Sequence, residues 1–311
     1  MKKTLIIIYL LFSYIILYAA DPVIVNGESD TNDSNSLLPA EKYRMKRIYQ
    51  IGGYYIDASP GLSFIKNKNL SPDIWNINGD FGYKFNVGYF QSLNQWAWVK
   101  LGVGFSSYSA HISGSGVFTS PEFKDIDNDA YIESLTVSNA DYSINPMYLT
   151  IPLSIEFGNA NISKIGYYVN FGIEYSYLIH ENNKAIGTYS AKGIYPQWGV
   201  ELENIPELGF YSERNVGTDW NMQKSNISLK GGAGITIPLS GVVIFKLGLT
   251  GYLGLKDISN KEIKKDDSSP ISQQAYEFRS KYINSPLATS KGSKSFYTGI
   301  EFGFYISKRV K

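Results

Sequence analysis

Residue types that carry acid–base or nucleophilic chemistry are few in this sequence. It contains two histidines, His111 and His180, and no cysteine, which excludes cysteine nucleophiles, thiolate metal sites and disulfide bonds. Ser113 follows His111 at the spacing that places both side chains on one face of a β-strand, as a histidine base and a serine nucleophile would require. A carboxylate would have to orient the histidine, and Glu122 and Glu133 are the candidates. The simpler interpretation of the pair is ordinary polar residues at the end of a strand.

A second candidate site is the acidic run 125–129, DIDND, which resembles the first half of a calcium-binding loop. Such a loop needs glycine at its sixth position and glutamate at its twelfth, where this chain has Ala130 and Thr136. The run is therefore predicted to be an acidic loop exposed to solvent. No phosphate-binding loop or histidine cluster accompanies it in the sequence, and we expect neither a metal nor another cofactor.

Nine further charged residues lie within stretches in which apolar residues alternate with small or polar ones. They are Asp57, Asp80, Lys84, Lys100, Glu156, Glu174, Lys230, Lys246 and Glu301. In residues 164–179, KIGYYVNFGIEYSYLI, every second residue from Ile165 onward is apolar or aromatic, with Gly166 and Asn170 on the opposite parity. This alternation predicts a β-strand with one apolar face and one small or polar face. The strand is longer than the average of about 5–6 residues and long enough for the ~9–11 residues that cross a bilayer.

The same pattern occurs eight times along the chain. The predicted strands are residues 54–65, 80–90, 96–108, 148–157, 164–179, 227–239, 243–255 and 296–306. Pro60 falls inside the first of them and predicts a bulge or an irregular stretch, because proline cannot donate to a strand ladder.

Short and long connections between these strands alternate strictly. Residues 91–95, 158–163 and 240–242 are short connections, whereas residues 66–79, 109–147, 180–226 and 256–295 are long ones. Short turns at one end and long loops at the other are typical of a transmembrane β-barrel. The predicted fold is therefore all-β, an eight-stranded antiparallel up-and-down transmembrane barrel with long extracellular loops. A short helix is predicted at residues 272–282, after Pro270 in the last loop.

The charges and glycines indicate which way the two faces of each strand point. The apolar faces carry no Asp, Glu, Lys or Arg, while glycines such as Gly102, Gly172 and Gly232 gather on the other face. Glycine weakens a strand that faces solvent, but in a narrow eight-stranded barrel small residues make room for larger ones. The polar face is therefore predicted to line a closed lumen. Because unpaired buried charges are costly, the nine charged residues are predicted to form an interior network of ion pairs and hydrogen bonds.

Residues 148–155, YLTIPLSI, resemble the Y-L-x-I-P-L strand of PorT-like outer-membrane β-barrel proteins, often labelled as the porin family. The Gly-rich stretch 230–235 and the strand 296–306 are similar too, and the resemblance spans about residues 50–307. It implies location in the cell outer membrane, contact with outer-membrane lipid and with the barrel-assembly machinery, and an interior filled by side chains despite the family label. Barrel-type lipid A deacylases use a pair similar to His111 and Ser113 on their lipid side, which implies a lipid-modifying alternative.

The beginning of the chain has the pattern of a targeting segment. Residues 1–20 combine Lys2 and Lys3, an apolar run and the small residues Ala19 and Ala20, which predicts a signal peptide, with an uncleaved anchor as the alternative. The polar residues 21–49 are predicted to be a flexible periplasmic leader, and residues 50–311 the outer-membrane barrel domain.

Together these features predict a structural or surface-interaction protein, not an enzyme, that meets a surface ligand or host partner through its loops. Trp96 and Trp98, after a short turn, are predicted to join an aromatic belt at the membrane interface, and Trp198 and Trp220 to contact a partner. The near balance of 29 basic and 28 acidic residues argues against a nucleic-acid partner. The alternatives are a lipid-modifying deacylase-like enzyme, a small-solute channel, or a soluble secreted barrel that binds an apolar ligand.

Overall fold

The structure is a computed structural model of the chain, and it describes residues 52–67, 73–94, 96–159, 165–217, 222–240, 242–259, 271–283 and 292–307. The predicted signal peptide and leader lie outside the described residues, as does Trp220. Among the described residues, no helix combines the length and the apolar character needed to cross a membrane.

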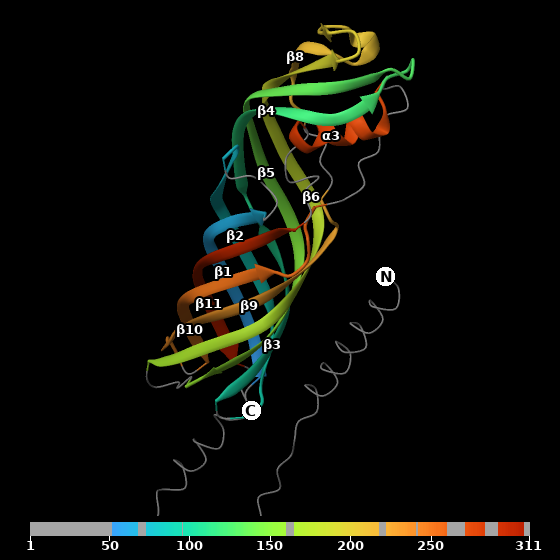
Figure 1. The fold of residues 1–311 in the computed structure, drawn as a ribbon. Helices are drawn as coiled ribbons and strands as arrows, with labels where there is room; N and C mark the ends of the chain where they lie inside the picture. The colour runs from blue at the N-terminus through green and yellow to red at the C-terminus, as the bar shows by residue number, and fades with distance from the viewer. Residues whose placement is uncertain are drawn as a thin grey trace, which may run out of the picture.

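Eight antiparallel strands form a closed ring (Figure 1). In ring order they are β1 (Gly52–Asn67), β2 (Trp75–Ser92), β3 (Ala97–Ser107), β5 (Ala130–Gly158), β6 (Gly166–Tyr195), β9 (Ser225–Pro238), β10 (Val243–Gly254) and β11 (Ser293–Ser307). Pairing of β1 with β11 closes the ring. The eight-stranded antiparallel barrel predicted from the sequence is confirmed.

Each ring strand alternates between inward and outward side chains, as the sequence pattern predicts. Along β11 the outward residues Phe296, Ile300 and Phe304 are 37%, 47% and 43% exposed, whereas the inward residues Glu301 and Tyr305 are buried. The apolar face therefore points out of the barrel and the small or polar face points in. Glycine makes this interior possible, because a Cβ added at Gly102 or Gly248 would collide with the hydroxyl of an inward tyrosine.

The strand ladder at Pro60 is interrupted on one side without a change of register, so the predicted irregular stretch is confirmed and a bulge is not. The register with β2 runs without a shift through Ser59↔Lys84, Pro60↔Tyr83 and Gly61↔Gly82. On the β11 side the pairs Ala58↔Phe302 and Gly61↔Gly299 keep one register across the gap. The missing N–H of the proline is accommodated by leaving residues 59 and 60 out of the β11 ladder.

Two strands continue far beyond the barrel, which corrects the loops predicted at residues 109–147 and 180–226. β5 and β6 are 29 and 30 residues long and pair with each other along most of their length. Their upper parts form a sheet with β4 (Ala110–Lys124), β7 (Val200–Leu202) and β8 (Tyr211–Asn215). The short helices η1 (Pro206–Leu208) and α3 (Gln273–Ile283) accompany it, and Figure 1 shows α3 beneath this sheet. This assembly above the barrel is called the extension below.

A hydrophobic core fills the extension and joins the upper end of the barrel. Trp75 of β2 stacks on Phe118 of β4, and Phe118 stacks on Tyr282 of α3 with ring centroids 3.8 Å apart. The predicted helix at residues 272–282 is confirmed as α3, whose first turn is capped by the Ser272 hydroxyl accepting from the Ala275 N–H. The extension is thus a packed structure, not a set of separate loops.

Candidate functional site

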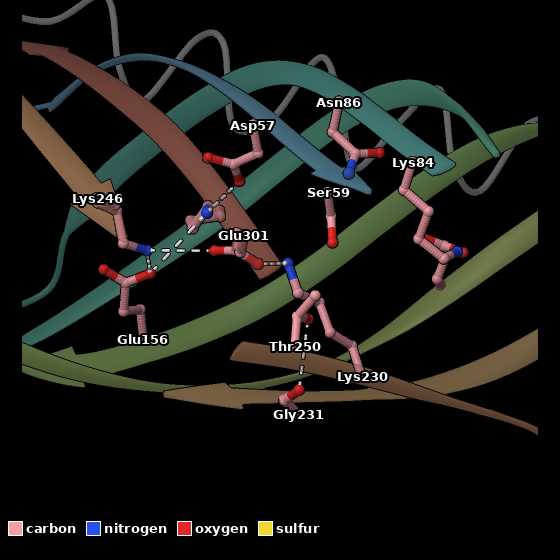
Figure 2. A network of polar contacts seen from close by, with 12 residues as sticks. Asp57, Ser59, Lys84, Asn86, Glu156, Lys230, Gly231, Lys246, Thr250 and Glu301 are labelled. Atoms are coloured by element: carbon pink, nitrogen blue, oxygen red, sulfur yellow. Dashed lines mark hydrogen bonds and ion pairs between the residues drawn. The ribbon is translucent and has the colours of Figure 1, made fainter. Parts of the chain in front are cut away.

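The lumen holds a chain of buried ion pairs that links four strands of the ring. Lys246 of β10 lies 2.5 Å from Glu156 of β5 and 3.6 Å from Glu301 of β11 (Figure 2). Glu301 in turn lies 3.2 Å from Lys230 of β9. All four side chains are at most 3% exposed. In so dry an interior each charge needs an opposite partner, and here every member has at least one.

A third lysine extends this network toward β1. The Lys100 ammonium of β3 lies 2.7 Å from Asp57 and 3.9 Å from Glu156. Farther up the lumen, Lys84 of β2 and Glu174 of β6 form a separate buried pair at 2.6 Å. The structure thus brings together eight of the nine charged residues singled out from the sequence, as four lysines facing four carboxylates.

The ninth residue, Asp80, departs from the prediction. Its side chain is exposed, and its carboxylate accepts a hydrogen bond from the N–H of Phe81. At the next residue toward the chain start, Gly79, the pairing of β2 with β1 has ended, and on its other edge β2 pairs with Ala110 of β4, which follows β3 there. Asp80 therefore sits at the point where the wall opens into the extension, and water can solvate it.

Tyrosines fill the space between the charges, a role that the sequence interpretation did not assign. The Lys246 ammonium lies 3.5 Å from the Tyr168 ring centroid, and the Lys84 ammonium lies 3.8 Å from that of Tyr252. The Tyr305 hydroxyl donates to Glu156 at 2.9 Å. The sequence did contain a signal for this role: Tyr252 and Tyr305 are an even number of residues from Lys246 and Glu301 on the same strands, so they point to the same inward face. Cation–π contacts of this kind add attraction beyond the ion pairs themselves.

Aromatic residues also close the lower end of the lumen. Tyr55, Phe90 and Tyr305 pack together there, with the Phe90 and Tyr305 rings stacked 4.9 Å apart. Trp98 packs against this cluster, so its predicted place in an outer aromatic belt is wrong, because its parity is that of the inward Lys100. Trp96, by contrast, is 57% exposed on the outside of the barrel.

In the extension, a buried ion pair fastens α3 to the sheet. The Arg279 Nε of α3 lies 2.6 Å from Glu133 Oε1 of β5, and the side chains are 5% and 0% exposed. The same guanidinium donates to the Gly209 carbonyl at 2.7 Å, so it joins α3 to the segment that follows η1. Burial raises the pKa of Glu133, although the charge of Arg279 opposes the shift. One side chain thus holds three segments of the extension in a fixed arrangement.

At the far tip of the extension, the acidic run 125–129 forms a compact turn. Asp125 Oδ1 accepts from the N–H groups of Asp127 and Asp129, and its Oδ2 accepts from the Tyr195 hydroxyl at 2.9 Å. These contacts occupy the carboxylate that would have been the first calcium ligand. Among the described residues, no group of three or more His, Cys, Asp or Glu side chains is arranged to hold a metal ion. Trp198, 54% exposed, stacks on Tyr195 beside this turn.

His111 lies at the base of the extension, on the outward face of its sheet. Its Nε2 is 2.6 Å from Asp141 Oδ1 of β5, and both side chains are about 40% exposed. Ser113 is the register partner of Asp141. The two candidate carboxylates do not orient His111, because Glu122 is exposed farther along β4 and Glu133 faces the core on the opposite side of the sheet. The sequence alone could not show the pairing of residues 111 and 141 across two strands.

A cavity of about 760 Å³ opens beside β6 just above the barrel, and it is lined by Leu178, His180, Glu181, Met222 and Lys224 among others. A second cavity, of about 610 Å³, lies against β8. His180, the second histidine of the sequence, is exposed at the mouth of the first cavity.

A comparison with protein families explains this architecture. Residues 52–260 match the family described as outer membrane protein beta-barrel domain. The chain belongs to this family. The protein is therefore a transmembrane β-barrel of the cell outer membrane, which confirms the fold and the location predicted from the sequence. No curated protein matches the chain.

Several solved outer-membrane barrels are similar in fold. Neisserial surface protein A matches with a TM-score of 0.32 and 12% identity over 82% of this chain and 96% of that chain. Ail, the attachment invasion locus protein of Yersinia pestis, matches with a TM-score of 0.27 and 14% identity over 82% and 97%. OprG from Pseudomonas aeruginosa matches with a TM-score of 0.32 and 12% identity over 83% and 97%. At these TM-scores the three similarities carry no argument about this chain.

For an outer-membrane barrel, the outward apolar face is the surface that contacts lipid. On β1 this face runs from Tyr54 to Phe64, a rise of about 33 Å along the strand at ~3.3 Å per residue. Strands tilted by about 35–45° reduce this to roughly 25 Å, the height of the apolar band of such barrels. The lumen network and the tyrosines around it therefore lie at the depth of the bilayer, and the extension projects from one side of it.

Proposed function

We propose that this outer-membrane barrel is a surface-interaction protein that acts through its extension and is neither an enzyme nor a solute channel. Its partners are then a ligand or host molecule at the cell surface, together with outer-membrane lipid and the barrel-assembly machinery. The single observation that carries the proposal is the extension itself, a packed sheet and helix built on 29- and 30-residue strands. A binding surface of fixed shape loses little conformational entropy when it meets a partner.

The filled lumen supports a role outside the barrel. Eight charged side chains are paired within it, and aromatic clusters occupy both of its ends. An eight-stranded barrel is just wide enough for its own side chains, so a conducting path would require these groups to move.

The surface available to a partner is the outward face of the extension sheet. On it Thr136 of β5 and Ser190 of β6 are register neighbours, with Val117 of β4 on the other side of Thr136. Hydroxyl groups on the surface of a sheet can donate and accept hydrogen bonds without burying a charge.

The test is adhesion of cells that display the protein to panels of immobilised glycans and matrix proteins. We expect wild-type cells to adhere to at least one panel member, and Thr136→Arg/Ser190→Glu cells to adhere at least about ten-fold less, equivalent to ~1.4 kcal/mol. The two new charges face each other across strands, so the sheet is retained while its surface is blocked. Leu239→Arg, at the opposite end of the barrel, is the matched control and should adhere normally. Wild-type cells that adhere no better than cells without the protein would contradict the proposal.

A hydrolytic role is the second candidate, favoured by the short distance between His111 and Asp141 with Ser113 nearby. Because the Nε2 of His111 faces the carboxylate, only its Nδ1 is left to act on a serine. The check is incubation of purified protein with lipid A, followed by mass spectrometry. Acyl-chain loss with wild type but not with His111→Ala would replace the proposal, and an unchanged lipid would support it.

A further inference from the structure

Two lysines lie side by side on the outer wall of the barrel at its upper rim. Lys66 of β1 and Lys294 of β11 are direct register partners, and both side chains are exposed on the outward face. Like charges placed directly opposite each other on neighbouring strands repel, so this pair opposes barrel stability when nothing binds it. Among the described residues, no carboxylate lies within ion-pair distance of either ammonium group.

One carboxylate accepts hydrogen bonds from the two residues that precede Lys294 in the sequence. Asp257, just after β10, accepts hydrogen bonds from the N–H groups of Gly292 and Ser293 and from the Ser259 hydroxyl. Because these donors occupy the Asp257 carboxylate, it does not form an ion pair with Lys294. Within the barrel proper, the carboxylates of the lumen are on the other side of the wall and paired there.

The residues directly below the lysines are aromatic. Phe64 and Phe296, two positions lower on the same strands, are also register partners and are 40% and 37% exposed. They form the upper end of the lipid-facing band. The two lysines follow about 7 Å higher along the strands, at the level expected for lipid headgroups. Two rings below and two cations above match a lipid whose acyl chain is apolar and whose headgroup is anionic.

We propose that Lys66 and Lys294 bind the phosphate group of a phosphorylated lipid of the outer leaflet, with its acyl chain against Phe64 and Phe296. A phosphate oxygen can accept from both ammonium groups at once, which turns their mutual repulsion into shared attraction. The rings supply apolar contact that inorganic phosphate lacks. The lipid is therefore the ligand, and the free anion is not.

The experiment is native mass spectrometry of the purified full-length barrel in a neutral detergent with titrated lipid A that carries phosphate. We expect wild type to retain at least one lipid, and Lys66→Gln/Lys294→Gln to bind about ten-fold more weakly or worse. Lys66→Arg/Lys294→Arg keeps both charges and should bind like wild type. The matched control Lys184→Gln/Lys281→Gln removes two exposed charges from the extension and should leave binding unchanged.

Further arms identify the ligand and exclude a folding defect. Dephosphorylated lipid A should bind the wild type as weakly as phosphorylated lipid A binds the Gln pair, and millimolar inorganic phosphate should not displace bound lipid. Without lipid, the Gln pair should unfold at an equal or higher temperature than wild type, because it relieves the repulsion. Equal lipid binding by wild type and the Gln pair would overturn the proposal. So would equal binding of phosphorylated and dephosphorylated lipid, or displacement by inorganic phosphate.

Discussion

Replacing Lys84 with methionine is expected to lower the free energy of unfolding of the barrel by about 3–5 kcal/mol. The Lys84 ammonium lies 2.6 Å from Glu174 Oε1, and both side chains are almost completely buried. The substitution leaves the Glu174 carboxylate in the lumen with no cation at that distance. It also removes the cation that lies 3.8 Å from the Tyr252 ring centroid. The measurement is urea unfolding in lipid vesicles, followed by the mobility shift between folded and unfolded barrel.

Two controls separate an unpaired buried charge from a simple loss of contacts. Lys84→Met/Glu174→Leu removes both charges and should recover most of the lost stability, because a buried ion pair and apolar residues of similar volume are often nearly equivalent. Lys192→Met breaks the solvent-exposed pair with Glu203, whose charged atoms are 3.0 Å apart, and should lower the free energy of unfolding far less than Lys84→Met does. Equal destabilisation by Lys84→Met and Lys192→Met would contradict a dry, paired lumen.

Replacing Arg279 with methionine is expected to release α3 from the extension at neutral pH. Glu133 then keeps a buried charge without its partner, at a cost of about 3–5 kcal/mol in the local opening of the helix. Chymotrypsin, which cleaves after aromatic residues, should cut the helix near Phe278 and Tyr282 at least about a hundred-fold faster than in wild type. Arg214→Met removes an exposed arginine of β8 and should leave the cleavage rate unchanged.

The effect of Arg279→Met should weaken in acid. Burial raises the pKa of Glu133 in the folded extension above the ordinary value of about 4.3. A carboxyl group with a raised folded pKa binds more protons in the folded state, so stability falls as pH rises from the unfolded pKa through the folded one. Loss of Arg279 removes the charge that holds the pKa of Glu133 down, so the pH range over which stability falls becomes wider. Cleavage of the variant should therefore be slower at pH 5 than at pH 7 by more than the change in wild type, and a parallel response would show that Glu133 is not the group involved.

The barrel was predictable from the sequence because its physical pattern is short-ranged. Alternation along residues 164–179 needs no knowledge of neighbouring strands to reveal a lipid face, and the inward position of Glu174 follows from parity alone. The tyrosines of the lumen were present in that same parity, but their role depends on which lysine lies across the barrel. Lys246 and Tyr168 belong to strands that are not neighbours in the ring.

The extension was not predictable because its signal is weaker and its contacts are distant. In the extension part of β5, the buried residues Tyr131, Leu135 and Val137 alternate with polar residues that face solvent. The apolar side of this stretch is interrupted by Glu133, so it lacks the continuous apolar face that marks the barrel strands. The ion pair of Glu133 with Arg279 joins residues 146 positions apart. Only folding places α3 beside β5, so the buried arginine looks in the sequence like any helical surface charge.

The central claim is a closed barrel that presents an ordered extension outside the cell, and cysteine labelling tests it most directly. The chain contains no cysteine, so Val117→Cys, Asn170→Cys and Leu239→Cys each provide one reporter, in the extension, in the lumen and near the turn between β9 and β10. With a membrane-impermeant maleimide, intact cells should be labelled at residue 117 only. After the outer membrane is made permeable, residue 239 should react as well, while residue 170 should stay unlabelled in the folded protein. Labelling of residue 170 at the rate of residue 117 would show an open lumen, and labelling of residue 239 on intact cells would show the opposite orientation.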